Sequence, residues 1–372
     1  MTLHNVVIVG GGVIGCALAR HLAHAGVRVL VVDRSRPGAE ASEAAAGMLA
    51  PLAEAGEAGP FLSLLRESRK RFPALAAALR EESGIDVEYR QDGTLFLAFN
   101  EADEAELEER WRWQHAAGLP IERLAAAELL RLEPAISPTV RGGLRFPEDH
   151  QVVSGRLVRA LWASAAHAGA EFRAEAAVRA VLHDGSRAAG VVLADGERVA
   201  AGAVVVATGS WSGTLENLPR PLPVFPVHGQ LLALEALPPL FRHVIDSPRC
   251  YLVPRADGRI IAGTTVERIG FRKVVTPAGM LSILSGALEI CAALAEMPIT
   301  DSWSGLRPGT PDGLPILGRD PEVENLFYAT GHFRNGVLLA PLTAEAVGEL
   351  VRSGHSPIDL SPFGVERFDA AG

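Results

Sequence analysis

Cysteine and lysine are both scarce in this sequence. The 372 residues contain three cysteines, Cys16, Cys250 and Cys291, which are too few and too scattered for a disulfide framework or a cysteine-rich metal site. Two lysines, Lys70 and Lys273, stand among 35 basic residues. So few cysteines fit a reducing compartment, and we therefore expect a cytoplasmic protein without a bound metal.

The sequence also lacks a targeting segment, a membrane span and an excess of positive charge. The start MTLHNVVIVGGG has no basic stretch leading into an apolar run and a cleavage site, so no signal peptide is expected. No apolar run reaches the roughly 18 residues of a membrane helix. A net charge of −9 argues against nucleic acid or an anionic membrane as the main partner. At 372 residues, two domains are expected.

The first 33 residues combine a strand, a helix and a second strand. Runs of Val and Ile predict buried parallel strands over residues 6–9 and 27–32. Small and apolar residues between them predict a helix over 13–25, and Gly26 follows it directly as a helix stop. This order is typical of a doubly wound α/β protein.

The turn before that helix has G-x-G-x-x-G spacing. Gly10 permits a tight turn, Gly12 lets a pyrophosphate approach the backbone, and Gly15 lets helix and strand pack closely. The N–H groups at the helix N-terminus attract the phosphates. Asp33, at the end of the second strand, stands where a carboxylate accepts hydrogen bonds from an adenosine ribose. These features predict dinucleotide binding but do not separate FAD from NAD.

The region after this unit departs from strand–helix alternation. SEAAAGMLAP, residues 42–51, is a small-residue loop that either lies against a flat ligand or is a flexible linker. We predict one long helix over 60–83 and a hairpin over 87–99 around a Gln-Asp-Gly turn. The alternation returns near residue 154, so an inserted domain is expected to begin in this region.

Two further stretches carry chemistry. In AVVVATGSWSG, a buried strand over 204–206 is closed by Ala-Thr-Gly, which resembles the second nucleotide-side signature of flavoproteins. In GHFRNGVLLAP, residues 331–341, a glycine-bracketed loop with His, Arg and Asn directly precedes an apolar run. A surface turn or a helix cap would each leave that arginine unexplained.

Taken together, these motifs resemble the D-amino-acid oxidase superfamily of flavoproteins, and most of all its glycine oxidase branch, which serves thiamine biosynthesis. The resemblance covers essentially the whole chain and rests on the G-x-G-x-x-G turn with its terminal acid, EAAAGML, VVVATGSWSG, CYLVPR, SGLRPGTPDGLPILG and GHFRNGVLLAP. It implies an α/β plus α+β fold with a Rossmann-like FAD-binding domain and an inserted substrate domain built on an antiparallel sheet. The FAD domain would comprise residues 1–85, 151–219 and 311–372, and the substrate domain residues 86–150 and 220–310.

The resemblance also assigns residues to the cofactor, which would be FAD bound non-covalently because no cysteine lies near the C-terminal flavin loop. The assigned residues are Gly10, Gly12, Val13, Ile14, Gly15, Asp33, Arg34, Ala45, Ala46, Gly47, Met48, Val178, Thr208, Gly209, Trp211, Arg307, His332, Arg334, Asn335, Gly336, Val337 and Leu338. The helix that begins near Asn335 would point its N-terminus at the pyrimidine end of the flavin. Its N–H groups would stabilise the negative charge of the reduced ring.

Three residues are predicted to contact the substrate. Arg307 is expected to clamp a carboxylate, because guanidinium offers the planar bidentate contact that this group requires. By resemblance, Tyr251 donates a hydrogen bond to the same carboxylate, and Arg334 lies near flavin or substrate. His228 either faces the site or is a core histidine, and we favour the core.

The resemblance implies oxidative deamination of glycine, sarcosine or small D-amino acids by hydride transfer from Cα to flavin N5. No side-chain general base is needed, the imine hydrolyses to a 2-oxo acid, and dioxygen is reduced to hydrogen peroxide. A homotetramer is typical of the family. The alternatives are a quinone-linked D-amino-acid dehydrogenase, a flavin-dependent 2-hydroxy-acid dehydrogenase and a non-enzymatic FAD-binding protein. Trp303 and Phe333 are expected to wall the cavity.

The sequence departs from the glycine oxidase pattern at two positions. Arg249 stands two residues before Tyr251 where the pattern has His, and Val266 stands where it has Met. We predict that Arg249 adds a cation at the pocket mouth and that Val266 alters pocket volume, which leaves room for substrates other than glycine. With two lysines, Lys70 and Lys273, the chain offers at most one candidate for the oxygen-activating lysine of sarcosine oxidases.

Overall fold

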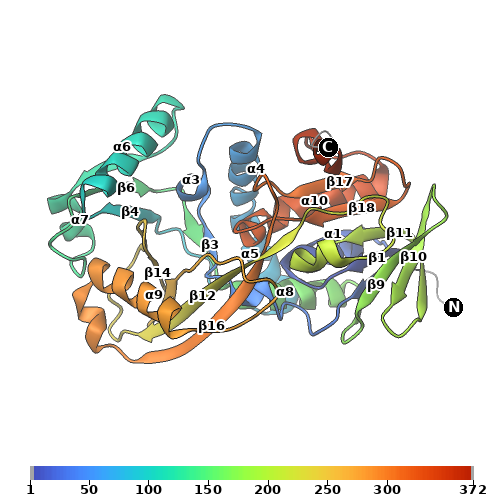
Figure 1. The fold of residues 1–372 in the computed structure, drawn as a ribbon, viewed down its shortest axis with the longest axis horizontal. Coiled ribbons are helices and arrows are strands. Elements are labelled where there is room, and N and C mark those ends of the chain that lie inside the picture. Colours follow the sequence, from blue (N-terminus) through green and yellow to red (C-terminus); the bar gives the residue numbers. More distant parts are fainter. Residues whose placement is uncertain (1–3, 370–372) are drawn as a thin grey trace.

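A computed structural model describes residues 4–369, and two eight-stranded sheets dominate it (Figure 1). The first sheet has the order β17-β18-β11-β1-β2-β8, with β9 and β10 attached to β11 through antiparallel pairs. Its central strands are parallel, with runs of Val in β1, β2 and β11, and most of their side chains are buried on both faces. Its strands are β1 (His4–Val9), β2 (Val29–Val32), β8 (Glu171–Arg173), β9 (Val178–His183), β10 (Ala188–Leu193), β11 (Arg198–Val206), β17 (Ile316–Arg319) and β18 (Leu326–Thr330).

The second sheet is antiparallel apart from one pair and has the order β16-β12-β15-β14-β13-β4-β6-β5. Two long strands, β12 and β16, run from it toward the first sheet, and Figure 1 shows them crossing the middle of the molecule. Its strands are β4 (Thr94–Ala98), β5 (Glu122–Ala125), β6 (Gly142–Phe146), β12 (Phe225–Glu235), β13 (Val244–Asp246), β14 (Tyr251–Pro254), β15 (Arg259–Gly263) and β16 (Ile299–Gly309).

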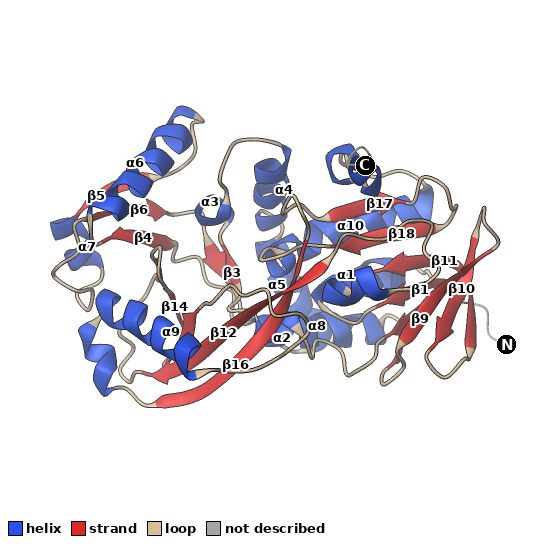
Figure 2. Cartoon of the chain, in the orientation of Figure 1, coloured by secondary structure: helices blue, strands red, loops and turns tan. Residues whose placement is uncertain are grey.

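Helices cover both sheets, as Figure 2 shows. A core of Val, Ile, Leu and Ala side chains joins α1, α8 and α10 to one face of the first sheet, and another core joins α9 to the second. The helices are α1 (Val13–His24), α2 (Ala41–Ala44), α3 (Pro51–Glu54), α4 (Pro60–Arg69), α5 (Phe72–Ser83), α6 (Glu101–Ala116), α7 (Ala126–Leu132), α8 (Ser154–His167), α9 (Pro277–Ile290) and α10 (Gly336–Ser353). Short 3-10 turns are η1 (Gly209–Thr214), η2 (Ala292–Glu296), η3 (Ser361–Phe363) and η4 (Val365–Phe368), and a two-stranded pair joins β3 (Met48–Leu49) to β7 (His150–Gln151).

Two predictions about local structure are wrong. The single helix over 60–83 is broken into α4 and α5, because Pro73 lacks an N–H donor and its ring would clash with the carbonyl of Arg69 in a continuous helix. The hairpin over 87–99 does not form: β4 pairs with β6 and β13, and Arg90 makes an isolated bridge to Gln151. The predicted α/β plus antiparallel architecture is confirmed, whereas the assignment of residue ranges to two domains stays a prediction. Across residues 4–369, no helix has both the length and the apolar character needed to cross a bilayer.

Candidate active site

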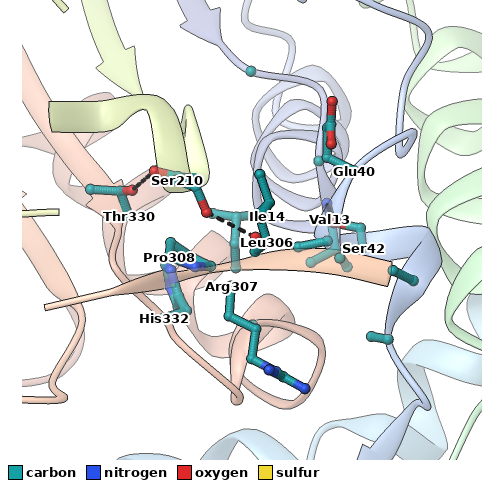
Figure 3. A pocket seen from close by; sticks show the side chains of 18 of the residues that line it. Val13, Ile14, Glu40, Ser42, Ser210, Leu306, Arg307, Pro308, Thr330 and His332 are labelled. Carbon is teal, nitrogen blue, oxygen red and sulfur yellow. Dashed lines mark hydrogen bonds between the residues drawn. The ribbon is translucent and has the colours of Figure 1, made fainter. Parts of the chain in front are cut away.

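A cavity of about 390 Å³ lies where the two sheets meet, at the carboxyl ends of the parallel strands. Its wall includes the residues at the ends of β1, β2, β11 and β18, which is where doubly wound proteins bind their ligands. All residues that the sequence assigned to cofactor or substrate line it except Gly15 and Leu338. In Figure 3 the Arg307 side chain extends from β16, apart from Ile14 of the glycine turn. The cavity therefore has a glycine-turn end and an arginine end.

The glycine turn brings β1 and α1 into contact. A Cβ atom at Gly15 would overlap the carbonyl oxygen of Gly10, and one at Gly10 would overlap the carbonyl oxygen of Ala207. Gly15 therefore serves packing and not the cavity wall, which explains its place outside the cavity. The backbone N–H of Val13, in the first turn of α1, donates to Ser42 Oγ at 2.9 Å. That contact ties the helix N-terminus to the small-residue segment.

Asp33 is held beside the glycine turn. Its Oδ2 accepts the backbone N–H of Gly11 at 2.6 Å, and its Oδ1 accepts that of Ser35 at 2.8 Å. The Ser35 hydroxyl also donates to Oδ1 at 3.1 Å. Because a carboxylate has about four lone-pair sites, one site stays free for a ribose hydroxyl. Next to it, the Arg34 guanidinium lies 3.4 Å from the ring centroid of Trp211. This end of the cavity thus offers acceptors and a flat aromatic and cationic surface.

The SEAAAGMLAP segment is ordered by partners from other elements, so it is not a flexible linker. The hydroxyl of Ser154 donates to the carbonyl oxygen of Ala45 at 2.5 Å, and the guanidinium of Arg255 donates to that of Ala46. Burial lowers the pKa of Arg255 to about 10. Sequence reasoning missed Arg255, since a charged residue after a strand carries no signal that it will turn inward to hold a distant backbone.

The arginine end of the cavity places Arg307 next to Tyr251. Arg307 donates from Nη2 to Thr264 Oγ1 at 2.7 Å and from Nη1 to the carbonyl oxygen of Thr265 at 3.3 Å. Burial raises the pKa of Tyr251 and lowers the pKa of Arg307, and each of these two groups also shifts the pKa of the other. Their proximity means that one small anion could contact both groups.

The loop before α10 contributes three of the predicted residues. Arg334 forms an ion pair with Glu54, with 2.9 Å between Nη2 and Oε1, and this neighbour raises the pKa of Arg334. His332 is buried and its Nε2 lies 3.1 Å from Thr343 Oγ1, and burial lowers its pKa to about 3. Asn335 directly precedes α10, whose N-terminal residues line the cavity. Sequence reasoning missed Glu54, which nothing in the local pattern distinguishes from other acids nearby.

Other predicted positions lie elsewhere. Arg249 pairs with Asp103 at 2.7 Å and with Glu289, away from the cavity wall, and Val266 is 59% exposed and also outside it. The predictions that these two residues alter the pocket are therefore wrong. Arg249 precedes β14 and is held by two acids, and Val266 lies beyond the end of β15 with its side chain in solvent.

Three other residues that were considered for the site, Trp303, His228 and Lys273, do not line the cavity. The indole N–H of Trp303 donates to the carbonyl oxygen of Ala44 at 3.0 Å, so Trp303 supports the small-residue segment without lining the cavity, whereas Phe333 lines it. His228 is fully buried beside Glu267, in the core as we favoured. Lys273 pairs with Glu40 at 2.9 Å and does not line the cavity.

Comparison with known proteins identifies the family. The family described as FAD dependent oxidoreductase matches residues 5–350. A glycine oxidase of Geobacillus kaustophilus (strain HTA426) is 37% identical over 368 residues, which cover 98% of this chain and 97% of the relative. The chain belongs to the FAD-dependent oxidoreductase family.

Solved structures agree with that assignment. The crystal structure of glycine oxidase from Geobacillus kaustophilus matches with a TM-score of 0.95 and 36% identity, covering 99% of each chain. Iminodiacetate oxidase from Chelativorans sp. BNC1 matches with a TM-score of 0.87 and 27% identity over 97% of this chain and 98% of that one. The predicted family, fold class and FAD cofactor are confirmed, and the chain is an FAD-dependent oxidoreductase.

Proposed function

We propose that this enzyme oxidatively deaminates glycine, sarcosine or a similarly small D-amino acid to the 2-oxo acid, an amine or ammonia, and hydrogen peroxide. One observation carries the proposal: the guanidinium of Arg307 and the buried phenol of Tyr251 share one end of the cavity whose other end is the glycine turn. A guanidinium beside a phenol is suited to a carboxylate. The likeness to glycine oxidases over nearly the full length of both chains supports the same reaction.

The cavity residues suit FAD. The N-terminus of α1 at Gly12 would hold the pyrophosphate, Asp33 would accept from the adenosine ribose, and the N-terminus of α10 at Gly336 would face the pyrimidine end of the flavin. The volume of about 390 Å³ falls within the range of about 300–1,000 Å³ that is usual for cofactor sites. These assignments are proposals about single residues, whereas the FAD cofactor itself follows from the family.

FAD, when bound, accepts the hydrogen that leaves the substrate Cα and passes the electrons to dioxygen. Arg307 would bind the substrate carboxylate through two parallel hydrogen bonds, and Tyr251 would donate a third. Burial raises the pKa of Tyr251, so the phenol keeps its proton and stays a donor. His332 stays neutral because burial lowers its pKa to about 3, so it adds no competing positive charge. The lone pair of the neutral substrate amine makes a side-chain base unnecessary.

Several finer points of the proposal rest on the resemblance alone. They are a homo-oligomeric assembly, a cytoplasmic location and a role in thiamine biosynthesis. A quinone-linked D-amino-acid dehydrogenase and a flavin-dependent 2-hydroxy-acid dehydrogenase would need the same flavin site. The likeness to glycine oxidases favours the amine over the hydroxy acid and oxygen over quinone as acceptor.

The test is a peroxide assay on the purified yellow protein with glycine, sarcosine and small D-amino acids under air, with dye reduction run anaerobically in parallel. We expect peroxide from at least one of these amines. For Arg307→Lys we expect kcat/KM to fall by about 10- to 100-fold with FAD content unchanged, because lysine keeps the charge but loses the bidentate fork.

Arg249→Lys is the matched control, since Arg249 lies off the cavity and should leave turnover unaltered. Full turnover in Arg307→Lys would contradict the carboxylate clamp. Bleaching of the flavin by amines without peroxide would instead identify a dehydrogenase, and turnover of glycolate but of no amine would favour the hydroxy-acid reaction.

A further inference from the structure

The arginine end of the cavity contains an acid whose role the proposed reaction does not explain. Glu54, the last residue of α3, lines the cavity, and its side chain is 16% exposed. Its Oε1 lies 2.9 Å from Nη2 of Arg334. Placing a largely buried carboxylate in a site meant for carboxylate substrates carries an electrostatic cost, so its presence calls for a functional reason.

Glu54 is not needed to hold its own helix. The backbone of α3 is anchored by other groups: Arg110 Nη1 donates to the carbonyl oxygen of Ala53 at 2.7 Å, and Gln114 Nε2 donates to that of Leu52 at 2.8 Å. The N–H of Leu52 also donates to Asp149 Oδ1 at 3.3 Å. These bonds orient the end of α3 toward the cavity whatever side chain stands at position 54. The Glu54 carboxylate is thus directed to Arg334 by the fold.

The charges at this end of the cavity nearly balance. Arg307 and Arg334 lie close enough for Arg334 to contribute, after burial, to the lowered pKa of Arg307. Glu54 offsets the charge of Arg334, and Tyr251 is neutral. Asp246 lies in range of both members of the Glu54–Arg334 pair, and burial raises its pKa to about 7. Among the charged groups that line this end of the cavity, Arg307, Arg334 and Glu54 sum to one net positive charge, which matches a single substrate carboxylate.

We propose that Glu54 restricts the substrate to one carboxylate, by neutralising Arg334 and repelling a second anionic group. Arg307 forms no ion pair with any residue from 4 to 369, so it remains as the cation for the substrate carboxylate. A substrate with a second carboxylate would place that second group against Glu54. Like charges set against each other in a binding site are an effective means of excluding the wrong partner. This inference rests on the proposed function, because it concerns which carboxylic amines enter the same site.

Glu54→Gln tests the proposal, because the amide keeps the shape and removes the charge. Sarcosine and iminodiacetate are suitable probes: both are secondary amines derived from glycine, and they differ by one carboxylate. We expect the ratio of kcat/KM for iminodiacetate to that for sarcosine to rise about tenfold or more in Glu54→Gln. Glu57→Gln is the matched control, since Glu57 is exposed, lies three residues away and is outside the cavity wall. It should leave the ratio unchanged.

A binding measurement separates this inference from the reaction itself. Titration of the flavin absorbance with acetate and malonate, on holoenzyme, should show malonate binding about tenfold more tightly to Glu54→Gln than to the unmodified enzyme, with acetate altered less than twofold. The gain should vanish when Arg334→Gln is added, because the second carboxylate then has no cation to pair with.

The opposite outcomes are equally clear. An unchanged substrate ratio and unchanged malonate binding in Glu54→Gln would overturn the proposal. Equal losses of about 100-fold for both amines would also overturn it, because they would assign Glu54 to the amine or to folding. A failure of the proposed reaction would look different: the unmodified enzyme would make no peroxide from any amine, while the acetate and malonate titration would still report on Glu54.

Discussion

Single residues around the cavity acquire their properties from partners that are distant in the sequence. Arg307 is oriented by Thr264 and Thr265, more than 40 positions away, and Arg334 is neutralised by Glu54, which is further still. Arg249, only two positions from Tyr251, is turned to Asp103 instead. Nearness in sequence is therefore a poor guide to which charged side chains share a site.

His332 leads to a prediction about pH. Burial lowers the pKa of His332 to about 3 in the folded protein, below its ordinary value of 6.5. Between pH 3 and pH 6.5 the unfolded chain therefore binds a proton at this histidine and the folded protein does not. His332 contributes stability above pH 6.5 that is lost as pH falls toward 3. Between pH 6.5 and pH 3, the free energy of unfolding should therefore fall more in the unmodified protein than in His332→Gln, by up to about 4 kcal/mol.

Urea unfolding at several pH values measures this difference. His355→Gln serves as the control, because His355 is exposed and its removal should leave the pH dependence in place. An identical acid-side slope for His332→Gln and the unmodified protein would mean that His332 is protonated in the folded state despite its burial.

At the scale of elements, the site is built where strands end and helices begin. The first turn of α1 and the first turn of α10 both face the cavity, and their N–H groups and dipoles favour negative charge there. The strands β1, β2, β11 and β18 end at the same edge and bring these helix ends together. Close contact between α1 and β1 is a condition for this geometry.

Gly15→Ala should disturb that contact. A Cβ atom at Gly15 would overlap the carbonyl oxygen of Gly10, so α1 must move away from β1 and from the phosphate position. We expect the free energy of unfolding to fall by about 1–3 kcal/mol and FAD affinity to fall at least about tenfold. Chemical denaturation and FAD titration of the apoprotein measure both effects.

Gly155→Ala, in the first turn of α8, is the matched control. A Cβ atom there would meet its nearest neighbours at an ordinary 3.8 Å, and alanine costs less backbone entropy than glycine in a helix. It should be neutral or slightly stabilising. If Gly15→Ala bound FAD as tightly as Gly155→Ala does, the role given to the glycine turn would be wrong.

At the scale of the whole molecule, the cavity is lined by residues from both sheets. Its wall takes Gly10 and Thr208 from the first sheet's strand ends and Gly229, Tyr251 and Arg307 from the second sheet. The long strands β12 and β16 connect the two parts. A ligand that fills this cavity therefore contacts residues that only the complete fold brings together.

Removal of FAD should accordingly destabilise the whole protein. A ligand that binds the folded state alone, at 100 times its Kd, stabilises it by about 2.7 kcal/mol. We expect the apoprotein to have a lower Tm than the holoenzyme and to regain the difference with added FAD. NAD at the same concentration should leave Tm unchanged, and an equal rise with NAD would contradict the flavin assignment.

Much of this protein follows from the sequence by itself. The glycine spacing with Asp33, the Ala-Thr-Gly strand end and the C-terminal GHFRNG loop require local backbone geometry, which short stretches of sequence encode directly. These motifs therefore predicted the family, the cofactor and residues that do line one cavity. The break before Pro73 likewise has a local steric cause that the sequence contains.

Only the tertiary structure decided how distant side chains meet. The pairing of β4 with β6 and β13 in place of a hairpin, the turn of Arg249 toward Asp103, and the contact between Glu54 and Arg334 each depend on elements far apart in the chain. The physical reason is that strand pairing, side-chain direction and ion pairing are set by three-dimensional packing, which brings distant groups together and which no local pattern encodes.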